Sequence, residues 1–198
     1  METFKKGEYK YGTEHFRSFA EIHEMAEKLG WIGKTISFEK MTKEKWEEVK
    51  AGIIKSTQLI DKYLGSYIPN YYFTFEENEE SRSVVYFMEE VKEDRHLPPA
   101  GEVDNFLVVF CQMFSDTTRQ GESFLVDLHK IENFIYGHTA DKPQPQLYFI
   151  DFFPFYFGNP LIKKEKILFF LSEFAKIYGK SSFPKTNEAI LKLNQLEA

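Results

Sequence analysis

The sequence has little of several features that would assign a protein to a well-marked class. Its 198 residues contain one cysteine, Cys111, which excludes an internal disulfide and a cysteine-rich zinc site and favours a reducing compartment. No apolar run reaches about 18 residues, the length that suggests a membrane-spanning helix. The N-terminus, METFKKGEYKYG, lacks the apolar core of a signal peptide. We therefore expect a soluble, cytoplasmic protein.

Excess positive charge is also missing from the chain. The formal net charge is −6 at pH 7, whereas proteins that bind a nucleic-acid backbone usually carry basic patches. The sequence therefore predicts no nucleic-acid partner, and the absence of long apolar runs predicts no membrane partner. The length is sufficient for one domain, or for two small lobes of one enzyme, around a real core.

Aromatic residues are what the sequence has in abundance. They make up 17% of the chain, with 21 Phe, while the shares of hydrophobic and charged residues are ordinary for a soluble globular protein. The core is therefore expected to be built from aromatic rings rather than from branched aliphatic side chains. Cys111 falls within an apolar segment and is interpreted as a small core residue and not a nucleophile.

Helical and strand patterns follow one another along the chain and predict an α+β fold. Apolar residues recur at three- and four-residue steps in some segments and alternate with polar ones in others. The expected elements are a helix over 13–29, a strand over 34–40, a long helix over 42–64 that Thr42 can cap, a hairpin of 71–78 and 83–91, a buried helix over 103–118, two apolar strands within 124–153, and helices over 162–178 and 187–196.

The two apolar stretches within 124–153 each deliver polar side chains. FLVDLHKIENFIYG supplies Asp127, His129 and Asn133, and LYFIDFF supplies Asp151. An aspartate buried between Ile and Phe-Phe is costly unless it is paired or binds a cation. We expect Asn133 and Asp151 to converge on one Mg²⁺, with Asp127 close to an acceptor hydroxyl. His129 is interpreted as a structural histidine beside Asp127.

In element order and in these motifs the sequence resembles the protein-kinase-like fold, in particular the aminoglycoside and small-molecule phosphotransferase branch. That branch carries a D-L-H-x-x-N catalytic loop and a later I-D-F or I-D-W, and the resemblance covers about residues 34–155. It implies a compact two-lobed fold. Residues 1–95 would form a reduced N-terminal lobe, and residues 96–198 a mostly helical C-terminal lobe that begins with the connector HLPPAG.

The resemblance implies a role for the polar residues and for the end of the hairpin. Asp127 would be the catalytic aspartate that orients or deprotonates the acceptor hydroxyl. Asn133 and Asp151 would hold Mg²⁺ against the phosphates of ATP. The backbone from Glu89 to Val91 would contact the edge of the adenine.

The resemblance also implies a lysine that contacts the phosphates, on the strand before the long helix. Lys34 and Lys40 share one face of that strand and both remain eligible. Its glutamate partner on the helix would be Glu47 or Glu48. The leading hypothesis is thus an ATP- and Mg²⁺-dependent phosphotransferase that acts on a small hydroxylated substrate or on a protein.

Departures from the family pattern favour a rival hypothesis. Asp127 and Asn133 are six residues apart, where the family has five. No G-x-G-x-x-G follows a first strand, and Asp151 precedes Phe-Phe instead of Phe-Gly. The rival is a catalytically degenerate kinase-like domain that serves as a protein-binding module, and a third interpretation is an unrelated α+β binding domain. Retention of three polar residues in an aromatic centre favours the enzyme, because unused buried charges cost stability.

Overall fold

A computed structural model of the chain describes residues 24, 26–39, 41–77, 81–119, 131–151 and 164–196. The expected mixture of helices and antiparallel strands is confirmed. The elements are β1 (Ile32–Glu39), α2 (Lys43–Leu64), β2 (Tyr71–Glu77), β3 (Ser81–Met88), β4 (Lys92–Glu93), α3 (Ala100–Arg119), η1 (Ile131–Asn133), β5 (Phe134–His138), β6 (Gln146–Phe149), α4 (Lys164–Tyr178), η2 (Lys180–Ser182) and α5 (Pro184–Leu196). The helix expected over 13–29 lies mostly outside the described residues, and 26–29 are helical.

The long helix α2 begins and ends at the residues that the sequence suggests. Thr42 is extended, and its side-chain oxygen accepts the N–H of Lys45 at 3.3 Å, as an N-cap does. At the other end a Cβ on Gly65 would collide with the carbonyl oxygen of Asp61, so only glycine fits there. One stripe of the helix is buried at three- and four-residue spacing, namely Trp46, Val49, Ile53, Ile60 and Leu64.

The strands form two separate antiparallel sheets. The first has the order β1-β3-β2, and its central strand β3 pairs Tyr86 with Lys34 on one side and with Phe73 on the other. The second has the order β4-β5-β6. Because side chains alternate along β3, Tyr86 faces the main core with α2, whereas Val85 and Phe87 pack with Ala26 on the opposite face.

One aromatic core joins the two sheets and helices α2 to α5. Phe106 of α3 lies at its centre. Ring centroids of Tyr67, Phe110, Phe134 and Phe149 lie 4.8–6.4 Å from that of Phe106, in edge-to-face geometries. Among the described residues the core contains as many buried Val, Leu and Ile side chains as aromatic ones. The prediction of a core rich in rings is therefore confirmed, but its second part, that rings would replace branched aliphatic side chains, is wrong.

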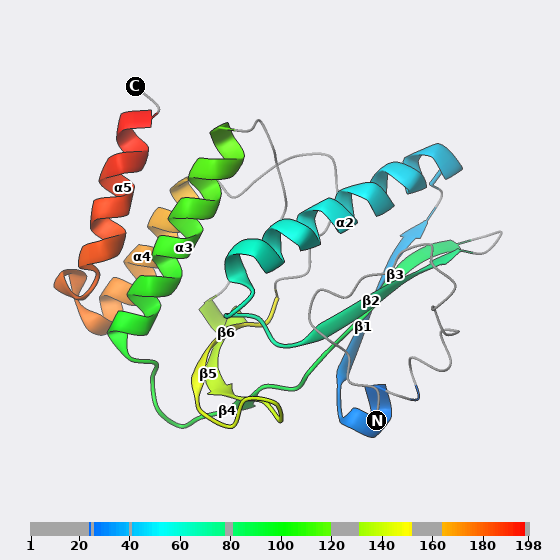
Figure 1. Ribbon diagram of the computed structural model, residues 1–198, viewed down its shortest axis with the longest axis horizontal. Helices are drawn as coiled ribbons and strands as arrows, with labels where there is room; N and C mark the ends of the chain where they lie inside the picture. The colour runs from blue at the N-terminus through cyan, green and yellow to red at the C-terminus, as the bar shows by residue number, and fades with distance from the viewer. Residues whose placement is uncertain are drawn as a thin grey trace.

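The elements are arranged with α2 across the first sheet and with α3, α4 and α5 gathered on the far side of the second sheet (Figure 1). The second sheet thus lies between the helical bundle and the first sheet. Within the described ranges, no helix combines the length and the apolar character needed to cross a bilayer.

A buried carboxylate ties α5 to α3. Asp104 of α3 is 2% exposed and accepts hydrogen bonds from the peptide N–H of Lys185 at 3.1 Å and of Thr186 at 2.9 Å. The hydroxyl of Thr186 also donates to it at 2.6 Å. Peptide N–H groups in the first turn of a helix have no partner within the helix. Asp104 therefore caps α5 from a neighbouring helix, with its charge at the positive end of the helix dipole.

Candidate functional site

Asn133 and Asp151 lie at the same end of the β5–β6 hairpin. Asn133 closes η1 directly before β5, and Asp151 follows β6 after one residue. Phe134 pairs with Phe149 in the register, and the peptide N–H of Ile150 donates to the carbonyl of Asn133 at 2.8 Å. The side-chain nitrogen of Asn133 lies 3.4 Å from Oδ2 of Asp151. The proximity of these two side chains, expected from the sequence, is confirmed, while their role as metal ligands stays a prediction.

Lys34 reaches this pair from the other sheet. Its Nζ lies 3.6 Å from Oδ1 of Asp151, and the side chains are 47% and 23% exposed, respectively. One carboxylate oxygen of Asp151 thus faces an ammonium and the other faces the amide of Asn133. Three residues singled out in the sequence therefore converge from separate elements: β1, the end of η1 and the residue after β6.

Tyr86 is a further residue of this site, and the sequence pattern does not single it out. Its ring lies next to the Lys34 ammonium. Tyr86 lies opposite Lys34 in the β1–β3 register, and Nζ of Lys34 is 5.9 Å from its ring centroid. Burial, and then the nearby charge of Asp151, raise the pKa of the Tyr86 hydroxyl well above its usual range, so it stays protonated at neutral pH. The π-electrons give the face of the ring a partial negative charge, which attracts the Lys34 ammonium. The pairing of Lys34 with Tyr86 is between β1 and β3, which are separated by the long helix and β2, so no local pattern in the sequence fixes it.

The glutamates expected to pair with the lysine point elsewhere. Glu48 lies 2.7 Å from Nζ of Lys45 and is 61% exposed, and Glu47 pairs with Lys50 at 2.5 Å. The structure places neither glutamate beside Lys34. The helix phase explains this correction, because Lys50 occupies the buried stripe and positions 47 and 48 fall outside it.

Asp127, His129 and Lys40 lie outside the described residues. The structure therefore neither supports nor opposes the catalytic role expected of Asp127. Of the two eligible lysines, Lys34 is the one whose position is described. Considering only the described parts of the chain, no three His, Cys, Asp or Glu side chains are grouped as metal ligands would be.

After β3, Glu89 and Val91 differ in the hydrogen bonds that they make. The Glu89 side chain is 4% exposed, and its carboxylate accepts the amide of Asn70 at 2.9 Å and the peptide N–H of Asp141 at 3.0 Å. The Glu89 N–H donates to the carbonyl of Asn70 at 2.8 Å. The peptide N–H of Val91 makes no hydrogen bond to any other residue that the structure describes. The Glu89 side chain and its peptide N–H are thus committed to the fold, whereas the peptide N–H of Val91 is not.

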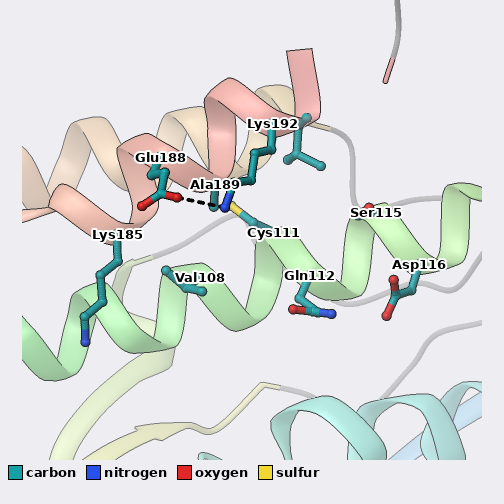
Figure 2. Close-up of a pocket in the computed structure, with 10 residues that line it drawn as sticks. Val108, Cys111, Gln112, Ser115, Asp116, Lys185, Glu188, Ala189 and Lys192 are labelled. Carbon is teal, nitrogen blue, oxygen red and sulfur yellow. Dashed lines mark ion pairs between the residues drawn. The ribbon is translucent and has the colours of Figure 1, made fainter. Parts of the chain in front are cut away.

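A groove of about 610 Å³ lies elsewhere, between α3 and α5 (Figure 2). Its lining residues are Val108, Cys111, Gln112, Ser115, Asp116, Lys185, Glu188, Ala189, Lys192 and Leu193. Burial raises the pKa of the Cys111 thiol to about 11, so the thiol is neutral at physiological pH. The interpretation of Cys111 as a core residue is confirmed.

The charged side chains of this groove are already paired within the protein. Lys192 lies 2.8 Å from Glu188, as the dashed line in Figure 2 marks. Nζ of Lys185 donates to Asn105 at 2.7 Å, and Asp116 accepts the hydroxyl of Tyr63 at 2.7 Å. The groove therefore offers less to a charged ligand than the site at Asp151 does. The contacts that Asp151 makes are long, so a ligand could replace them.

The site at Asp151 combines a cation, an amide and a carboxylate at the meeting point of two sheets. Such a set can bind a metal ion through oxygen atoms and an anion through the ammonium. The function is inferred from these residues themselves. Comparison of the sequence with protein-family models gives no match, and comparisons with curated proteins and with solved structures give none either.

Proposed function

We propose that this protein is a cytoplasmic, ATP- and Mg²⁺-dependent phosphotransferase of the protein-kinase-like fold, acting on a small hydroxylated substrate or on a protein. The observation that carries the proposal is the convergence of Lys34, Asn133 and Asp151 from separate elements. Phosphoryl transfer asks a protein mainly to position the phosphates and to neutralise their charge. A lysine beside an Asn–Asp pair has the groups for both tasks.

The donor set fits Mg²⁺. Asp151 and Asn133 carry carboxylate and amide oxygens, the hard ligands that this ion takes in proteins. When bound, Mg²⁺ would neutralise negative charge on the phosphates. Lys34 is half exposed, so its ammonium can leave Asp151 and contact a phosphate without crossing a packed core. Before a phosphate binds, the ion pair with Asp151 keeps the Lys34 side chain close to the site. This pairing lowers the entropy cost of ordering the side chain when the phosphate binds.

The order of elements supports the two-lobed arrangement. The strand with Lys34 precedes a long helix and a hairpin, and Asn133 and Asp151 flank a second hairpin after the connector. In this proposal residues 1–95 form the N-terminal lobe and residues 96–198 the C-terminal lobe. The carbonyl of Glu89 and the N–H of Val91 contact the adenine edge, which offers an amino donor and a ring-nitrogen acceptor.

One observation favours the degenerate binding module as a second candidate. In protein kinases the phosphate-contacting lysine pairs with a glutamate of the following helix. Here Glu47 and Glu48 pair with lysines of their own helix, and Lys34 pairs with Asp151. If this ion pair is only structural, the protein has no use for nucleotide.

Melting curves with and without Mg²⁺–ATP, combined with transfer of labelled γ-phosphate, test the two candidates. At a ligand concentration about 100 times Kd we expect the melting temperature of the wild type to rise by about 5–10 °C. Asp151→Asn should abolish the rise, whereas Glu93→Gln, an exposed acid on β4, should keep it. A wild type that is indifferent to Mg²⁺–ATP would overturn the proposal. Stabilisation by nucleotide without phosphate transfer to any acceptor or to water would favour the degenerate module.

A further inference from the structure

Three segments of the chain meet at Asn70, between α2 and β2. Its side-chain nitrogen donates to Oε2 of Glu89 at 2.9 Å and to Oδ2 of Asp141 at 2.8 Å. The peptide N–H of Asp141 donates to Oε1 of Glu89 at 3.0 Å. We call Asn70, Glu89 and Asp141 the clasp. It joins the start of β2, the end of β3 and the turn between β5 and β6.

The chemistry of the clasp is specific to these residue types. A buried carboxylate is tolerated only where donors compensate for its lost hydration. Among the described residues, Glu89 has no cation within ion-pair distance, so the Asn70 amide and the Asp141 peptide supply its donors. Both hydrogens of one amide nitrogen are used, one for each carboxylate. A side chain without this –NH₂ group would leave Glu89 short of a donor and bring two carboxylates together without a bridge.

The position of the clasp relates it to the candidate site. The first sheet carries Lys34, and the β5–β6 hairpin carries Asn133 and Asp151. The β5–β6 hairpin also contacts the connection between α2 and β2 through Gln146, whose side chain donates to the carbonyl of Ser66 at 2.8 Å. The clasp differs from that contact because it holds Glu89 itself, where the backbone leaves the first sheet toward Val91.

We propose that the clasp is a positioning device for the segment Glu89–Val91, which fixes its backbone against the hairpin that carries Asn133 and Asp151. The carbonyl of Glu89 and the N–H of Val91 then keep one orientation toward the base of a purine nucleotide while its phosphates lie at Lys34. The clasp acts through the hydrogen bonds that hold this backbone in place. Its residues do not contact the nucleotide. The inference rests on the proposed function, which supplies the nucleotide.

Hydrogen exchange on the full chain without nucleotide tests the physical part of this inference. Asn70→Leu removes the donor at similar size, and Gln146→Leu is the matched control, since it removes another side-chain bond between the β5–β6 hairpin and the α2–β2 connection, away from Glu89. We expect the amides of Glu89 and Asp141, whose N–H groups are hydrogen-bonded within the clasp, to exchange about tenfold faster in Asn70→Leu, because the loss of the bridging amide opens these bonds more often. The control should exchange as the wild type does. Equal effects of both changes, or none, would overturn the clasp.

Binding of Mg²⁺–ATP and of Mg²⁺–tripolyphosphate, which lacks the base, tests the role. Asn70→Leu should weaken Mg²⁺–ATP binding about tenfold and change tripolyphosphate binding less than about twofold. Gln146→Leu should change neither. Equal weakening of both ligands, or an ATP affinity that stays at the wild-type value, would overturn the inference and leave the proposed function standing. A wild type that binds neither ligand would overturn both.

A gentler variant keeps the test decisive if Asn70→Leu does not fold. Asp141 is exposed, and Asp141→Ala removes one of the amide's acceptors while it retains the peptide N–H that Glu89 accepts. The expected loss is about threefold for Mg²⁺–ATP, again with tripolyphosphate unaffected. An unchanged ratio of the two affinities would overturn the positioning role.

Discussion

Asp151 and Asp104 are carboxylates that lie where two parts of the molecule meet, but their surroundings differ. Asp104 is 2% exposed and accepts three hydrogen bonds of 2.6–3.1 Å from the first turn of α5. The Asp151 side chain is 23% exposed, and its contacts to Lys34 and Asn133 are 3.6 Å and 3.4 Å long. A normal N–H···O bond spans about 2.7–3.2 Å. The short, buried hydrogen bonds of Asp104 would be costly to break. The long contacts of the partly exposed Asp151 can be replaced by contacts to a ligand.

The largest expected effect is on the structural side of this comparison. Asp104→Ala leaves the first-turn N–H groups of Lys185 and Thr186 without their acceptor in a buried place. We expect the free energy of unfolding to fall by about 2–4 kcal/mol, measured by urea denaturation. Glu188→Gln, an exposed acid on the same helix, should change it by less than about 0.5 kcal/mol. A similar small loss for Asp104→Ala would mean that α5 is capped by water instead.

Asp151→Asn should show the opposite behaviour. Its partner Lys34 is half exposed, so the loss of the ion pair should cost less than about 1 kcal/mol in the absence of ligand. The same change should remove the stabilisation by Mg²⁺–ATP, which is about 2.7 kcal/mol at 100 times Kd. Urea denaturation with and without ligand measures both quantities. A variant that is destabilised as strongly as Asp104→Ala would class Asp151 as a structural carboxylate.

Lys34→Met sharpens the comparison from the cation's side. The change keeps the length of the side chain over Tyr86 and removes the charge, so Asp151 loses its nearest described cation. We expect Mg²⁺–ATP to bind about tenfold more weakly, with little change in unfolding free energy. Lys28→Met, at an exposed lysine that pairs with Glu24 within its own helix, is the control. Equal affinities of the two variants would remove Lys34 from the phosphate site.

The smallest effect concerns Cys111, a titratable group committed to the core. Burial raises its pKa to about 11, so the folded thiol stays protonated where the unfolded thiol ionises. The unfolded state binds fewer protons above pH 9, and stability should therefore fall as pH rises from about 9 toward 11 and be unaffected below that window. Iodoacetamide should label the folded protein slowly at pH 7.5 and the urea-unfolded protein quickly. Rapid labelling of the folded state would contradict the burial.

Local patterns in the sequence are enough to predict the longer elements and part of the site, but not the short strand β4 or the 3-10 helices η1 and η2. Asn133 and Asp151 flank the two strands of a hairpin, so their proximity follows from pairing alone. Lys34 could be proposed because alternation along its strand fixes which side chains share a face. In both cases the relative position of the residues follows from a single strand pairing or from the alternation of side chains along a single strand.

Relations between distant segments could not be predicted in this way. The outward direction of Glu48 depends on the phase with which α2 meets the sheet. The commitment of the Glu89 side chain depends on Asn70 and Asp141, which arrive from other segments. The sequence predicts a last helix from residue 187, whereas α5 begins at Pro184. A proline at the first helical position was a usable local signal, but Asp104, which caps the helix, lies about 80 residues earlier.

The aromatic core around Phe106 has a consequence for how the molecule comes apart. Its ring contacts Tyr67, which follows the long helix of the first half, and Phe134 and Phe149 of the second hairpin. Neither half can therefore lose its packing without exposing rings of the other. We infer that the two proposed lobes melt together in one cooperative step, with equal calorimetric and van't Hoff enthalpies. A fragment ending at residue 95 would lack Phe106, and Tyr67 would lose that packing partner, so we expect such a fragment not to fold on its own.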